Sequence, residues 1–436
     1  MKKFSVVLLV SIFVFMLSTY GFAAETITLL WRVNPNEHTM LQNLVKAFEE
    51  KYPDIQVKVI EVPQPEYEPK LSSMFAAGDP PDVFSSVGWS GFIDFVLRDM
   101  ALDLTPFIKR DKFDTKDFYP QSIKGMSYGG KIMGLPLGGG PSLMYYNIDL
   151  FNETGLPPIP TNWDDNTWTW DKMLEYAQKL TKRDDSGRIT QFGVNMSLWP
   201  VDAYSWLWGG SWFPSEAYKT GLTDKSYVNS PAVIKSLQNA ADLIHKYHIS
   251  PTRQEAQMFQ QFIDPFVSGK IGMGATGAWF FQNFSVIKNF KWSVGALPKG
   301  TTRKDVLFSD PWIIAKTSKH PEAAWNFVKW TLSKEGQEVL MKGYVSFSLR
   351  PSLFYTVEQK APNVPKDKLK EAILGAIKYS QESSNHIIAN WSAIERLANA
   401  ELDPMWLGKA TAKEVVKSLQ PKLDKLLKDT KEQYTK

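Results

Sequence analysis

The chain has 436 residues, enough for two lobes of typical domain size, and its 43% hydrophobic and 22% charged content is that of a globular protein rather than a disordered one. Its 50 basic and 46 acidic side chains give a net charge of +4 and are mixed along the sequence, which argues against a nucleic-acid partner. Because there is no cysteine, disulfides, thiolate catalysis and cysteine-based metal sites are excluded.

The first 23 residues predict an export signal. Lys2 and Lys3 supply positive charge, an apolar run extends over 4–17, and Gly21-Phe22-Ala23 forms a small-x-small cleavage site. A membrane anchor is the alternative, but the apolar run is shorter than the about 20 residues of a spanning helix. We expect a mature chain that starts near Ala24 and, without a cysteine for lipid attachment, is free in the periplasm.

A strand–helix–strand pattern opens the mature chain. Residues 27–31 are apolar and β-branched, apolar residues recur at three- and four-residue steps over 40–48, and residues 55–59 alternate between apolar and polar. With short connections, this pattern predicts a βαβ unit and a largely parallel sheet. A helix over 70–82 and a strand at 82–85 continue the alternation.

A glycine-rich segment follows at 129–141. Its six glycines flank Leu135 and Leu137, which predicts an extended strand with hinge-capable backbone at its ends. A phosphate-binding loop at Gly138-Gly139-Gly140 is the alternative, but the spacing of a phosphate loop is absent. Further helices are expected over 171–182 and 231–247, strands near 266–273 and 292–298, and a last helix in which Pro421 marks a kink or boundary.

Several short segments, in order along almost the whole mature chain, together resemble family 1 extracellular solute-binding proteins, in their carbohydrate-binding branch. They are residues 44–53, 70–83, 135–151, 266–279, 295–300 and 406–411. The chain departs from that pattern by an added aromatic-rich stretch between about Asn162 and Gly221.

The resemblance implies an α/β fold of the two-lobed periplasmic-binding-protein type (type II), with a ligand cleft between lobes joined by crossing strands. It places the crossings near 135–140, 293–297 and 343–350. Lobe one would comprise residues 24–138 and 295–342, and lobe two residues 139–294 and 343–436. Closure of the hinge around ligand is the expected motion.

Candidate ligand-binding residues follow from the chemistry of sugars, whose C–H faces stack on aromatic rings and whose hydroxyls bond to carboxylates, amides and arginine. The first candidate is Trp279, which follows a small-residue loop and matches the stacking position of the family. Each of the others has a core or surface role as its alternative. They are Arg32, Asn34, Glu37, His38, Trp89, Trp199, Tyr204, Trp208, Trp212, Asp310, Trp312, Arg350 and Trp391.

The resemblance predicts a protein that is not an enzyme and that delivers an oligosaccharide or related polyol to the transmembrane subunits of an ABC importer. We expect a monomer without cofactor, metal, nucleic-acid partner or membrane anchor. A secreted glycoside hydrolase is the main rival, although a pair of carboxylates can always be found among 46 acidic residues. A sugar-sensing receptor of the same fold is the second rival.

Overall fold

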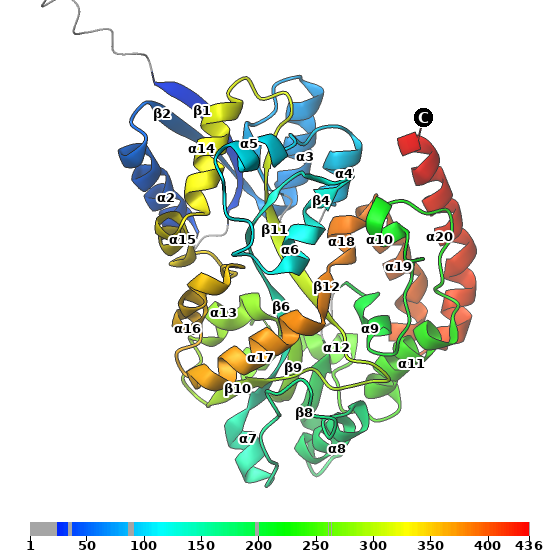
Figure 1. Ribbon diagram of the computed structural model, residues 1–436. Coiled ribbons are helices and arrows are strands. Elements are labelled where there is room, and N and C mark those ends of the chain that lie inside the picture. The colour runs from blue at the N-terminus through cyan, green and yellow to red at the C-terminus, as the bar shows by residue number, and fades with distance from the viewer. Residues whose placement is uncertain are drawn as a thin grey trace, which may run out of the picture.

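The computed structural model describes residues 24–33, 37–85, 91–196, 200–259, 261–262 and 264–435. Asn34, Trp89 and Trp199 lie outside these ranges, so their predicted contact with ligand stays a prediction. Figure 1 shows two bodies, one above the other, with strands β6 (Leu135–Asn147) and β11 (Asp305–Ile314) running between them.

The predicted βαβ unit is confirmed at the start of the first body. Strands β1 (Glu25–Val33) and β2 (Ile55–Pro63) pair in parallel, with Leu29 opposite Val59. Helix α2 (His38–Lys51) connects them and buries Met40, Leu41, Leu44 and Phe48, the residues whose spacing predicted it.

Ten strands form one sheet that continues through both bodies. The order is β2-β1-β3-β11-β6-β9-β8-β7, with β10 paired to β6 and β12 paired to β11. The remaining strands are β3 (Val83–Phe84), β7 (Lys182–Arg183), β8 (Ile189–Met196), β9 (Ile271–Gly277), β10 (Trp292–Gly295) and β12 (Ser380–Glu382), and a separate hairpin contains β4 (Ser127–Tyr128) and β5 (Lys131–Ile132).

Helices cover this sheet in both bodies. Those up to residue 153 and at 321–341 are α3 (Gln64–Ala76), α4 (Phe92–Leu97), α5 (Thr105–Arg110), α6 (Pro120–Gly125), α7 (Ile148–Glu153), α14 (Pro321–Thr331) and α15 (Lys334–Met341). The others are α8 (Trp170–Leu180), α9 (Ala203–Trp206), α10 (Ala217–Thr220), α11 (Pro231–His245), α12 (Arg253–Ala256), α13 (Phe281–Phe284), α16 (Tyr355–Lys360), α17 (Lys366–Tyr379), α18 (Ser384–Ile387), α19 (Trp391–Trp406) and α20 (Ala412–Thr435), with short 3₁₀ turns η1 (Gln257–Phe259), η2 (Pro265–Ser268), η3 (Ala278–Phe280) and η4 (Pro351–Leu353).

The glycine-rich segment is a strand and not a phosphate loop. Gly138, Gly139 and Gly140 lie in β6, opposite Asp310, Ser309 and Phe308 of β11. A Cβ on Gly139 would stand 1.9 Å from the carbonyl oxygen of Phe308. Glycine is therefore required here because the backbones of the two crossing strands approach too closely for a side chain.

The second crossing differs from the expectation. Residues 292–295 form β10, which pairs with Tyr145 and its neighbours in β6 inside the second body. After β6, the second strand that passes between the bodies is β11, which pairs with β12 at one end and with β3 at the other. The division of the chain into lobes at the expected boundaries stays a prediction.

Two large hydrophobic clusters form the centres of the two bodies. The first includes Leu29, Trp312 and Trp325, and the second includes Tyr145, Met173 and Trp292. Helices α19 and α20 add a third cluster, in which Pro421 lies inside a continuous helix. Across the described part of the chain, no helix is both long and apolar enough to span a membrane.

Candidate functional site

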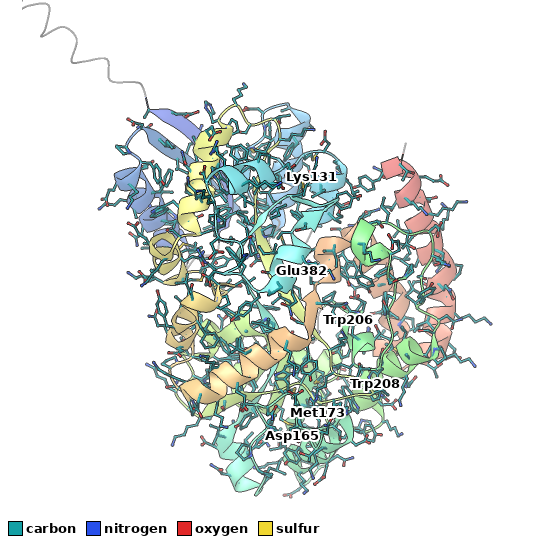
Figure 2. All side chains as sticks on the ribbon, in the orientation of Figure 1. Lys131, Asp165, Met173, Trp206, Trp208 and Glu382 are labelled. Atoms are coloured by element: carbon teal, nitrogen blue, oxygen red, sulfur yellow. The ribbon has the colours of Figure 1, made fainter. Side chains whose placement is uncertain are left out.

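The candidate site is the place where the middle of β11 passes between the two bodies. Strand β12 runs parallel to the start of β11, with Glu382 opposite Leu307, and this pairing brings the Glu382 carboxyl beside Ser309. The Ser309 backbone N–H donates to Glu382 Oε1 at 3.0 Å, and His386 Nδ1 lies 2.7 Å from the same oxygen. Figure 2 shows Glu382 at the level where the two bodies meet.

Five consecutive polar residues, Glu382 to His386, are buried at this point. Their exposed fractions are 5% for Glu382 and 0% for each of the other four. The Ser384 hydroxyl donates to Asp202 Oδ2 at 2.5 Å, which ties the segment to the turn before α9. Burying polar side chains this completely costs free energy unless their donors and acceptors find hydrogen-bond partners. Polar atoms that find no partner in the protein therefore indicate a role beyond folding.

Several polar atoms of this segment and its surroundings have no hydrogen-bond partner within the described ranges. They include Asp202 Oδ1, Glu382 Oε2, Asn385 Nδ2, His386 Nε2 and, at the end of β1, Arg32 Nε. An unmade hydrogen bond at a buried polar atom costs about 1–3 kcal/mol. This concentration of unpaired acceptors and donors indicates a binding site for a ligand that can both donate and accept hydrogen bonds.

A second polar group approaches the same place from the first body. The Tyr344 hydroxyl donates to Asp310 Oδ2 at 2.7 Å, and the backbone N–H of Val345 donates to the fully buried Glu37 carboxyl at 3.4 Å. Burial raises the pKa of Glu37 and of Asp310, and the positive charge of Arg32 opposes both shifts. His386 of the buried segment 382–386 also opposes the rise in the pKa of Asp310, so this group and the buried segment face one site.

An aromatic wall stands beside the polar groups. The rings of Trp279 and Phe308 meet edge to face with centroids 4.8 Å apart, and Phe308 meets the His386 ring at 6.2 Å. Trp279 is half-buried, and its ring folds back over Gly277, where a Cβ would lie 2.1 Å from the ring. The predicted stacking residue therefore lies next to the buried polar segment. We call Arg32, Asp202, Trp279, Asp310, Glu382, Asn385 and His386 the central site.

The carboxyl groups of the central site hold their protons more tightly than carboxyls in water. Burial raises the pKa of Asp202 to about 7, and the hydrogen bond from Ser384 partly opposes this rise. Burial also raises the pKa of Glu382, with the neighbouring His386 opposing the shift. Near neutral pH the Asp202 carboxyl can therefore donate as well as accept hydrogen bonds, which suits hydroxyl groups.

Three predicted tryptophans belong to the hydrophobic core, which corrects the expectation that they contact ligand. Trp312 is fully buried against Trp31 and Phe327, Trp212 is fully buried in the third cluster, and Trp391 packs there against Phe213. A sugar platform needs an open ring face, and these three rings are at most 1% exposed.

The structure also places four other candidates outside the central site. Arg350 Nε donates to Asp117 at 2.9 Å and its guanidinium lies over the Phe118 ring, so it forms a structural ion pair. Tyr204 is a core residue whose hydroxyl donates to the Met196 carbonyl. His38 and Trp208 are at the surface, the first beside Glu61 at 2.8 Å and the second under the Lys235 ammonium at 4.7 Å.

Asp202, Glu382, Asn385 and His386 are the functional candidates that sequence reasoning missed. A run of polar residues such as 381–386 is typical of an exposed loop, and only the packing of α18 between the two bodies buries it. The one available signal was the apolar Ile387-Ile388 directly after the run, which is too weak to indicate burial.

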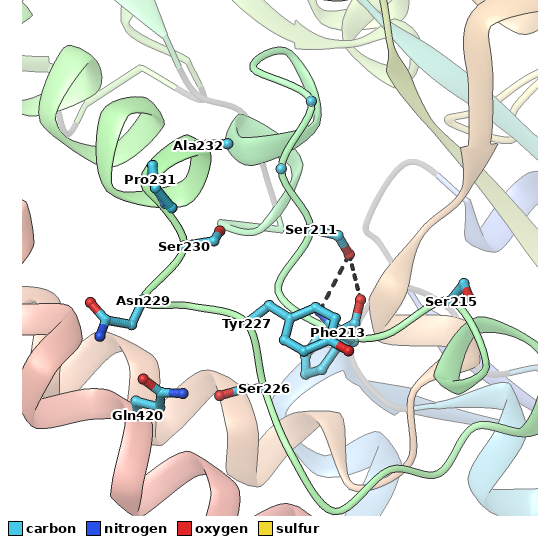
Figure 3. A pocket seen from close by; sticks show the side chains of 12 residues that line it. Ser211, Phe213, Ser215, Ser226, Tyr227, Asn229, Ser230, Pro231, Ala232 and Gln420 are labelled. Carbon is cyan, nitrogen blue, oxygen red and sulfur yellow. Dashed lines mark hydrogen bonds between the residues drawn. The ribbon is translucent and has the colours of Figure 1, made fainter.

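One hollow lies further from β11. Figure 3 shows a broad surface hollow of about 750 Å³ at the start of α11, with Tyr227, Asn229 and Gln420 on its walls. All of its walls belong to the second body, so closure between bodies would not enclose a ligand there. Within the described ranges, no cluster of three or more acidic or histidine side chains is arranged to hold a metal ion.

Comparison with known proteins shows the family of the chain. The family model described as bacterial extracellular solute-binding protein matches residues 34–338. The arabinooligosaccharide-binding protein of Bacillus subtilis (strain 168) is 25% identical over 385 residues, which are 83% of this chain and 84% of that protein.

Solved structures show the same fold. An ABC substrate-binding protein from Listeria monocytogenes in complex with cycloalternan superposes with a TM-score of 0.77 at 24% identity, covering 92% of this chain and 99% of the other. The maltose-bound T. maritima MalE3 superposes with a TM-score of 0.69 at 21% identity, covering 93% and 100%.

Proposed function

The chain belongs to the bacterial extracellular solute-binding proteins, and from that premise we propose that it captures an oligosaccharide or related polyol between its two bodies and delivers it to an ABC importer. The importer's transmembrane subunits are its protein partner. The protein acts as a monomer in the periplasm, after export and removal of residues 1–23, and is not an enzyme.

The buried, unpaired polar atoms of the central site carry this proposal. Asp202 Oδ1 accepts, Asn385 Nδ2 and Arg32 Nε donate, and His386 Nε2 can do either. A hydroxyl group donates and accepts at once, whereas a carboxylate only accepts and an ammonium only donates. Beside these atoms, Trp279 offers an aromatic ring for the apolar face of a sugar.

The relatives support the same class of ligand. The names of the compared proteins refer to an arabinooligosaccharide, cycloalternan and maltose, all carbohydrates. The hydrolase alternative has no support beyond the acidic residues, since the matching family consists of binding proteins.

The test is thermal unfolding of the chain from residue 24 onward in the presence of mono- and oligosaccharides, uronates and polyols. A ligand at 100 times its Kd stabilises the folded state by about 2.7 kcal/mol. We expect a saturable rise in Tm with one sugar class, and the sugar recovered intact afterwards. Asn385→Ala should lose the rise, while Asn229→Ala, in the surface hollow of Figure 3, should keep it.

Three results would count against the proposal. Cleaved sugar would favour a hydrolase, and a panel without any rise in Tm would exclude the sugar class. Sugar binding without stimulation of the ATPase of a reconstituted ABC importer would favour a sensing receptor.

A further inference from the structure

A cavity of about 300 Å³ opens between the two bodies next to the central site. Its walls come from both, with Ile93 and Lys124 from the first body and Tyr218, Lys219 and Lys304 from the second. Glu382 also lines it, so the cavity and the central site share a wall. In Figure 1 the elements around it, α4, α6, β4, α10, β12 and α18, gather at the level where the bodies meet.

Three lysines from three separate segments converge on this cavity. Lys124 is in α6, Lys219 is in α10, and Lys304 directly precedes β11. We call them the lysine pocket. Lys124 and Lys304 are exposed and make no ion pair with any described carboxylate, and Lys219 makes only an exposed contact of 3.4 Å with Glu216.

Among the described residues that line the cavity, the single carboxyl, Glu382, does not neutralise these charges. Glu382 is directed to Ser309 and His386, and burial raises its pKa. Like charges brought together without counterions repel one another, and the repulsion grows as two bodies close around a space that excludes water. An anionic group between the ammonium groups removes that repulsion.

The central site has a different character, because burial raises the pKa of its carboxyls, Asp202, Asp310 and Glu382, and such carboxyls suit neutral hydroxyl groups. The charged substituent of a ligand is therefore better placed among the ammonium groups of the lysine pocket. Tyr128, Gln121 and Gln381 on the cavity walls offer a ring and amides to the sugar unit that would carry the anionic group.

We propose that the ligand is an acidic oligosaccharide, with hydroxyl-bearing units in the central site and an anionic substituent held by Lys124, Lys219 and Lys304. This inference rests on the proposed function and narrows its substrate class. Lysine ammonium groups attract carboxylate, sulfate and phosphate alike, so the shared chemistry is an anion on a sugar ring.

The experiment is isothermal titration with pairs of oligosaccharides, each anionic member matched with its neutral parent. Uronic-acid, sulfated and phosphorylated pairs form three arms, which distinguish the source of the anion. At 20 mM salt we expect one anionic member to bind about tenfold tighter than its parent, and at 500 mM salt we expect the difference to shrink, because salt screens exposed charges.

Variants assign the preference to the lysine pocket. In the double variant Lys124→Gln/Lys304→Gln the anionic and neutral affinities should converge, whereas Lys225→Gln, an exposed lysine near Tyr227, should keep the difference. Neutral parents that bind as tightly as every anionic member would overturn the inference and leave the proposed function standing. A preference that persists in the double variant would also overturn it, and an absence of sugar binding in all arms would overturn both.

Discussion

Replacing Asp202 by asparagine should change how the stability of the protein depends on pH. The Asp202 side chain is completely buried, receives one hydrogen bond from Ser384 and leaves Oδ1 unpaired. Burial raises the pKa of this carboxyl from an ordinary value of 3.8 to about 7. The folded protein therefore keeps a proton that the unfolded chain gives up.

The sign follows from proton linkage. Below about pH 4 both states are protonated, and the group causes no loss of stability. Between pH 4 and 7 only the unfolded chain releases the proton, so the free energy of unfolding falls as the pH rises. The difference between 7 and 3.8 is about 3 units, and each unit corresponds to 1.36 kcal/mol, so the fall approaches about 4 kcal/mol.

The assay is urea unfolding from pH 4 to 8, compared between the wild type, Asp202→Asn and the exposed control Asp185→Asn. Asparagine is nearly isosteric and cannot ionise. As the pH rises, the free energy of unfolding of Asp202→Asn should therefore increase relative to that of the wild type. Asp185→Asn should run parallel to wild type. Parallel curves for wild type and Asp202→Asn would refute the reasoning, because Asp202 would then ionise equally in both states.

Four further variants test the division between site and core and the close approach of the crossing strands. Trp279→Ala should weaken sugar binding by about tenfold or more, since a stacked ring contributes about 1.5 kcal/mol, and an unchanged Kd in titration would remove this residue from the site. Trp312→Ala should destabilise the protein by about 3–5 kcal/mol in urea unfolding and leave the Kd of the folded protein unchanged, and a selective loss of affinity would contradict its core assignment. Gly139→Ala should cost about 3 kcal/mol or more because its Cβ would meet the Phe308 carbonyl. Gly155→Ala, at φ +67 in open space, should cost about 1 kcal/mol, and equal losses of Tm for these two would contradict the close approach of the crossing strands.

The order of elements could be predicted where periodicity is strong. In 40–48 apolar residues recur at helical spacing, and in 55–59 they alternate, because each pattern is the imprint of one buried face. The glycine-rich segment could also be predicted as an extended crossing strand, with its glycines interpreted as hinge-capable backbone. The close backbone approach at Gly139 follows only from its pairing with β11. The second crossing could not, because residues 292–295 and 305–314 are both apolar and extended, and only pairing across the sheet distinguishes them.

The sequence by itself therefore determined the α/β class and the family, and it predicted Arg32, Trp279 and Asp310, which lie at the central site. Tertiary structure alone decided which tryptophans pack the core and which polar residues are buried. The physical reason is that burial depends on neighbours far along the chain: Asp202 meets Ser384 across 182 positions, and Ser309 meets Glu382 across 73. Composition and local spacing carry no information about such pairs, and the central site consists of them.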